Sequence, residues 1–115
     1  MSPGVHVDRF PLLDALRTQD NTWSVLAPRY GVSNPDPPWK SSLSALCDCL
    51  DASGALPTLE RRSDEDGLSK VVYGDVSAPE RQLLALVHTM LSRGLVDESA
   101  LSRRMQVVRA RLEAV

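Results

Sequence analysis

The last third of the chain, residues 77–115, sets the strictest limits on the fold. Its first half carries apolar residues at helical spacing, namely Leu83, Leu84, Leu86, Val87, Met90 and Leu91. Ser77-Ala78-Pro79-Glu80 has the composition of a helix start, and Gly94 suits the left-handed residue that commonly ends a helix. These patterns predict an amphipathic helix that begins near Ser77 and ends just before Gly94.

A second helix is predicted immediately afterwards. Asp97 is a suitable N-cap, and Val96 before it can pack against a residue one turn into the helix. One apolar stripe runs along this helix, with arginines on its other faces: Leu101, Met105, Val108 and Leu112. Because the intervening turn is so short, we expect the two helices to lie antiparallel, stripe against stripe.

Composition excludes several classes of protein. The chain has 115 residues, enough for one domain, and a net charge of −2 that gives no reason to expect nucleic acid or a membrane as partner. No apolar run approaches the length of a membrane span, and the N-terminus lacks the pattern of an export signal. Cys47 and Cys49 are too close in sequence for an ordinary disulfide, so we expect reduced thiols in a cytoplasmic protein.

Residues 1–37 differ from the rest of the chain because prolines are frequent there. They leave room for one short helix, Pro11 to about Gln19, within an otherwise extended arm. Four of the five aromatic residues lie in the arm or at its end: Phe10, Trp23, Tyr30 and Trp39. Such an arm either packs back onto its own helices or lies on another protein, and the sequence leaves both alternatives open.

Residues 38–115 form the predicted helical domain. A helix should run from Pro38-Trp39-Lys40 to about Ala52 and end at Gly54, followed by a short charged helix from Thr58 to about Asp66 that ends at Gly67. Residues 70–74 are expected to be a brief extended or irregular link. The predicted fold is therefore all-α: four to five helices ending in an antiparallel helical hairpin, with an extended Pro-rich N-terminal arm.

No set of residues predicts an enzyme that works alone. Cys47-Asp48-Cys49 lacks the further donors that a thiolate metal site needs, so Cys47 is expected in the core and Cys49 near an interface. His88 lies in an apolar helix and is expected to be a packed or half-exposed side chain. The sequence contains neither a serine nucleophile pattern nor a glycine-rich phosphate loop.

A family resemblance is carried by several short pieces that occur in order and at nearly fixed separations. They are Trp39, the helix 43–50, Gly54, Glu60-Arg61-Arg62, Tyr73, Glu80-Arg81 and the stretch 90–101 with Gly94 at its turn. From Trp39 onwards, over about two thirds of its length, the chain resembles the N-terminal half of the nitrile hydratase β subunit. It is most similar to the separate form of that half, the β subunit of thiocyanate hydrolase.

The resemblance implies a subunit of a metalloenzyme that hydrates nitriles to amides or hydrolyses thiocyanate. The family uses non-corrin cobalt(III) or, as the alternative, non-haem iron(III), held by a Cys-x-x-Cys-Ser-Cys cluster with oxidised sulfurs. That cluster lies on the α-type subunit, so this chain itself would bind no metal or cofactor. Its partners would be the α-type subunit and a separate β-barrel polypeptide, as in thiocyanate hydrolase and the three-subunit toyocamycin nitrile hydratase. A further alternative is a metal-delivering activator protein of similar fold.

Arg62 is the site residue that the resemblance implies most directly. It falls where the family's β subunit has an arginine that donates hydrogen bonds to the oxidised cysteine oxygens, with Arg61 as the alternate. Tyr73 and Trp39 would lie at the subunit interface or substrate pocket, although packing is an equal alternative for Tyr73. Without the resemblance, Arg62 would be expected to pair with Asp64 or Asp66 at the surface.

The chain also departs from the family at one place near the pocket. Nitrile hydratases usually have two tyrosines just before the Glu-Arg of the penultimate helix, where this chain has Ala78 and Pro79. The loss of two rings predicts a roomier entrance, or one remodelled by another subunit.

Overall fold

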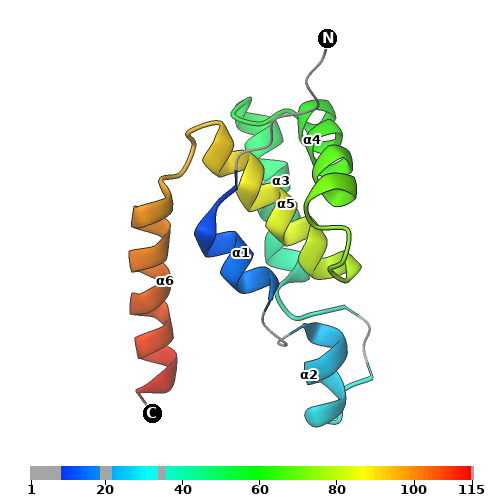
Figure 1. The fold of residues 1–115 in the computed structure, drawn as a ribbon, viewed down its shortest axis with the longest axis vertical. Helices are drawn as coiled ribbons and strands as arrows, with labels where there is room; N and C mark the ends of the chain where they lie inside the picture. Colours follow the sequence, from blue (N-terminus) through cyan, green and yellow to red (C-terminus); the bar gives the residue numbers. More distant parts are fainter. Residues whose placement is uncertain (1–8, 19–21, 34–35, 115) are drawn as a thin grey trace.

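The computed structural model describes residues 9–18, 22–33 and 36–114, and it contains six helices within these ranges (Figure 1). Their bounds are α1 Pro11–Arg17, α2 Trp23–Arg29, α3 Lys40–Ser53, α4 Thr58–Val71, α5 Ala78–Ser92 and α6 Glu98–Glu113. The same ranges contain no β-strand. The all-α prediction is confirmed, with one helix more than the upper number expected.

α5 is the central helix because it contributes to both apolar clusters of the core. One cluster joins it to α1 and the end of α4, through Leu13, Leu68, Val72, Tyr73, Leu84, Ala85 and Leu91. The other joins it to α3 and the turn after α3, through Leu43, Cys47, Leu56 and Leu86. Gly54 and Gly94 end α3 and α5 at φ of +76° and +72°, as the sequence predicted.

The prediction that a helix ends at Gly67 is wrong for α4. The helix continues through Gly67 to Val71, and the backbone N–H groups of Val72 and Tyr73 then both donate to the Leu68 carbonyl at 2.9 Å. A glycine inside a helix costs about 1 kcal/mol relative to alanine. Burial of Leu68, Val72 and Tyr73 at this end of α4 offsets that cost. Of the link expected over residues 70–74, residues 70 and 71 are therefore helical, and only residues 72–74 are irregular.

The N-terminal segment also differs from the prediction, because its described residues form two helices rather than one helix in an extended arm. α1 packs onto α5 through Leu13, and the Nη1 of Arg17 donates to the Val72 carbonyl at 2.9 Å. α2 contains Pro28 in its last turn, where the missing N–H removes one helical hydrogen bond just before the helix ends at Arg29. Residues 1–8 of the predicted arm lie outside the described residues.

α6 follows α5 after a short turn, as predicted, and the Asp97 side chain caps it by accepting from the Ala100 N–H at 2.9 Å. Its apolar stripe does not pack on α5, however. None of the residues of α6, all of which the structure describes, is buried. The helix stands along one edge of the molecule, on the side opposite α4 (Figure 1).

Candidate functional site

Arg62 lies on the outer face of α4. Its side chain is exposed, and within the described ranges it makes no hydrogen bond or ion pair. Leu59 lies on the same face, three residues earlier, and is 83% exposed. The outer face of α4 therefore presents a large apolar side chain beside a guanidinium whose five donors are unengaged within the described chain.

The acidic neighbours of Arg62 face a different arginine. Arg93, just after α5, donates to Asp64 Oδ2 from Nη2 at 3.0 Å and to Glu60 Oε2 from Nη1 at 3.4 Å. These ion pairs tie the end of α5 to α4. The expected alternative role of Arg62, a surface pair with Asp64 or Asp66, is not formed in the described part of the chain.

Arg61 lies on a different face of α4 from Arg62, because consecutive helical residues are rotated by about 100°. Its side chain is only 11% exposed, and Nη1 donates to Glu65 Oε1 at 2.7 Å. Its Nε is buried and has no partner among the described atoms. Hydrogen bonding with Thr58 lowers the pKa of Asp51 on α3, and the charge of Arg61 adds a smaller lowering. The same charge opposes the burial that raises the pKa of the Cys47 thiol. Arg61 is therefore a largely covered side chain that is already engaged within α4.

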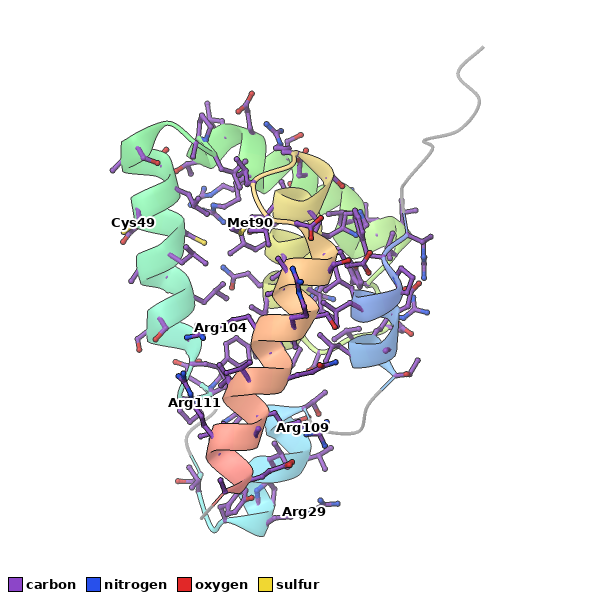
Figure 2. The ribbon with its side chains drawn as sticks, turned by 90° about the vertical axis from the view of Figure 1, so that its left-hand side faces the viewer. Arg29, Cys49, Met90, Arg104, Arg109 and Arg111 are labelled. Carbon is purple, nitrogen blue, oxygen red and sulfur yellow. The ribbon has the colours of Figure 1, made fainter. Side chains whose placement is uncertain are left out.

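The two cysteines occupy opposite environments on α3. Both are free thiols, with Cys47 buried in the core and Cys49 exposed on the outer side of the helix (Figure 2). Burial raises the pKa of Cys47 despite the opposing charge of Arg61. The predicted core position of Cys47 is confirmed. Across residues 9–18, 22–33 and 36–114, no three His, Cys, Asp or Glu residues cluster as metal ligands would.

Tyr73 lies in the core and does not reach the surface. It is 1% exposed, and its hydroxyl is 2.8 Å from Nδ1 of His88, which is also buried. Phe10 packs edge-on against the His88 ring, with 4.9 Å between the ring centroids. Burial, with a smaller contribution from the charge of Asp14, raises the pKa of Tyr73 to about 12. Of the two roles expected for Tyr73, the structure has the packing role.

Trp39 is half-buried at the start of α3 and lines a small cavity of about 230 Å³. The other lining residues are Leu16, Arg17, Thr22, Val76, Glu80, Leu83 and Leu84. The charged walls of this cavity also hold the N-terminal helices in place. Glu80 accepts from the Trp23 N–H at 2.6 Å and from the Ser77 hydroxyl at 2.7 Å, while Arg17 bonds the Val72 carbonyl.

This cavity has no signal in local sequence, because its walls come from three segments that are far apart in the chain: residues 16–17 with residue 22, Trp39, and residues 76–84. Glu80 was predicted only as part of a helix start, and its contact with Trp23 has no signal in local sequence. Pro79, one of the two departures from the family pattern, lines a neighbouring hollow of about 420 Å³ together with Trp23 and Val32.

Comparison with protein-family models, curated proteins and solved structures finds no match to this chain. Among the described residues, no helix is both long enough and apolar enough to cross a membrane.

Proposed function

We propose that this chain is the β-type, non-metal subunit of a hetero-oligomeric nitrile hydratase, in which it covers the metal centre of the α-type subunit. Trp39, the Glu60-Arg61-Arg62 run and the Gly94 turn carry the family resemblance behind the proposal. The β-type role needs a helical body and a guanidinium directed at another protein. A cytoplasmic location belongs to the same proposal, because both cysteines are free thiols.

The observation that carries the proposal is the state of Arg62. Asp66 stands four residues after Arg62, a spacing at which helical side chains meet, so a surface ion pair between the two would ordinarily be expected. That pair is not formed within the described chain, and Arg62 is exposed on the outer face of α4. Its donors are therefore available to anionic acceptors on a partner.

The chemistry of a guanidinium suits that role. The oxidised cysteines of the family's metal centre carry anionic sulfur-bound oxygens, and a planar fork of N–H donors can hold two such oxygens at once. When bound on the partner subunit, cobalt or iron supplies a Lewis acid for nitrile hydration. Arg62 would orient the ligands of that metal from outside its coordination shell, a contact that tunes a metal site. The buried Arg61 is the less suitable of the two arginines, because it already bonds Glu65.

The position of Leu59 also supports the proposal that the outer face of α4 meets the α-type subunit. Leu59 is 83% exposed and so contributes little to the packing of its own chain, and arginine is one of the residues enriched in protein–protein interfaces. The face of α4 that carries both residues would therefore be the surface that meets the α-type subunit.

The experiment is co-expression of this chain with the metal-binding and β-barrel polypeptides, followed by purification and assay of turnover. Arg62→Lys keeps the charge but loses the fork. We expect a complex with unchanged metal content and a turnover lowered about 10- to 100-fold. Arg29→Lys, an exposed arginine on α2, is the matched control and should turn over like the wild type. Wild-type turnover by Arg62→Lys would remove Arg62 from the mechanism.

Product analysis and complex stability separate the remaining alternatives. An amide product supports nitrile hydratase, whereas carbonyl sulfide and ammonia would assign the same subunit role to a thiocyanate hydrolase. A chain that associates only transiently before metal loading, and is missing from the active enzyme, would instead be an activator.

A further inference from the structure

α6 is an amphipathic helix, and the second half of its apolar stripe is left uncovered by the rest of the described chain. The stripe begins half-buried at Leu101 and Met105, next to the point where Glu98 accepts from the Leu12 N–H at 3.0 Å. Beyond Met105 the stripe is open: Val108 is 40% exposed and Leu112 is 74% exposed. An isolated helix of this length is marginal in water, so most of the stability of such a helix ordinarily comes from packing its apolar face.

The spacing of the stripe is that of a helix-pairing seam. Leu101, Met105, Val108 and Leu112 are separated by four, three and four residues, which is the alternation of the a and d positions in a heptad repeat. A stripe with this spacing faces one partner helix along its whole length. The seam therefore favours a helical partner over an irregular surface.

Arginines occupy the positions that flank the seam. In this register Arg104 and Arg111 are g positions and Arg109 is an e position, and all three are exposed along α6 (Figure 2). Arg109 pairs with Glu113 of its own helix at 2.9 Å, but both side chains are well exposed, and such a pair contributes little. Charges at e and g positions decide which partner a helix accepts, since they face the same positions of that partner.

We propose that α6 is a docking helix for an amphipathic helix of another polypeptide, with an apolar seam and Asp or Glu at its flanking positions. The inference goes beyond the function proposed above and does not depend on it. Two copies of α6 would place arginines opposite arginines in either orientation, so self-pairing is opposed by repulsion. An acidic partner helix turns the same positions into attractive pairs while covering Val108 and Leu112.

The test uses the full chain and two synthetic peptides of about three heptads, both with Leu at every a and d position. One peptide has Glu at every e and g position and the other has Lys. Fluorescence anisotropy should show that the Glu peptide binds at least about tenfold more tightly than the Lys peptide at low salt, with a smaller ratio at high salt.

Reversing the charges that flank the seam tests whether the peptides bind at α6. The variant Arg104→Glu, Arg109→Glu, Arg111→Glu should reverse the preference between the two peptides. The matched control is Arg29→Glu, Lys70→Glu, Arg103→Glu, which makes the same change of net charge at exposed positions off the seam and should keep the wild-type preference. Neither variant touches a buried residue, so circular dichroism should show an unchanged helical body.

Four results would each overturn the inference. They are equal binding of the two peptides, no binding at high micromolar peptide, and a dimer of the chain that Leu112→Arg dissociates. The fourth is binding to vesicles rich in anionic lipid that is as tight as binding to the Glu peptide.

Discussion

α5 and α6 are neighbours in sequence and have similar lengths and similar apolar stripes, yet they end in different environments. α5 buries Leu84, Ala85, Leu86, His88, Thr89 and Leu91, and it joins both clusters of the core. No residue of α6 is buried within the described structure. An amphipathic pattern therefore specifies a helix with an apolar face, whereas the neighbouring elements decide what packs on that face.

α1, and not α6, packs against the apolar face of α5 that the predicted hairpin would have used. Leu13 of α1 packs among Leu84, Ala85 and Leu91, and α4 covers another side of the same helix. The core of the body is therefore complete without the stripe of α6. On this account α4 and α6, on opposite sides of the molecule, present the two surfaces that other proteins meet: Leu59 and Arg62 on one, the arginine-flanked seam on the other.

Truncation of matched leucines should give the largest effect in this comparison. Leu13→Ala removes a fully buried side chain and should lower the free energy of unfolding by about 2–5 kcal/mol. Leu112→Ala, on α6, should change it by no more than about 0.5 kcal/mol. Urea unfolding followed by circular dichroism measures both. Similar losses for the two variants would mean that α6 belongs to the core.

The Tyr73–His88 pair should make the stability of the body fall at high pH. The folded protein holds the phenol proton to about pH 12, whereas the unfolded chain releases it near the ordinary pKa of about 10. The stabilisation is therefore complete below pH 10 and is lost as the pH rises to 12, by about 2–3 kcal/mol. Unfolding curves across this range should show the loss in the wild type.

Tyr73→Phe removes this pH dependence and isolates its cause. The free energy of unfolding of the variant should be lower by about 1–3 kcal/mol at neutral pH, because buried His88 loses its phenol partner. Its free energy of unfolding should then fall less steeply between pH 10 and 12 than that of the wild type. Tyr30→Phe, at an exposed tyrosine, is the control and should follow the wild type. An identical slope in Tyr73→Phe and the wild type would contradict the assignment.

Loss of the N-cap of α6 should give the smallest effect on the stability of the helical body, by which we mean helices α1 to α5. Asp97→Ala removes the acceptor of the Ala100 N–H and should destabilise α6 by about 0.5–2 kcal/mol. Because α6 buries no residue, helical content should fall while the unfolding midpoint of the body stays the same. Asp66→Ala, at an exposed acid inside α4, is the comparison variant. A lowered midpoint in Asp97→Ala alone would show that α6 supports the body.

The sequence predicted the elements whose limits are set locally. Gly54, Gly94 and Asp97 mark helix ends through their own conformation or side chain, and each lies where it was expected. Gly67 misled the prediction, because its cost is offset by the burial of residues beyond it. α2 was missed because prolines near it outweighed its short pattern, while Glu80 holds it from far away in sequence.

In the candidate site too, the features that the sequence did not predict depend on how the whole chain folds. Arg62 is exposed and forms no pair within the described chain although Asp66 stands four residues later, an outcome that local spacing does not reveal. Arg61 and Arg62 could be distinguished only in the folded chain, where the Arg61 side chain is 11% exposed and bonds Glu65 while Arg62 is exposed. The position of Tyr73 in the core likewise depends on its contact with His88 of α5.

Native-state hydrogen exchange of the isolated full chain tests most directly the claim that the body is complete and that α6 is left for another protein. The account predicts that amides of α5 exchange at least about a thousandfold more slowly than they would unfolded, while amides in the second half of α6 exchange nearly as fast as in an unfolded chain. Equal protection of the two helices would contradict it.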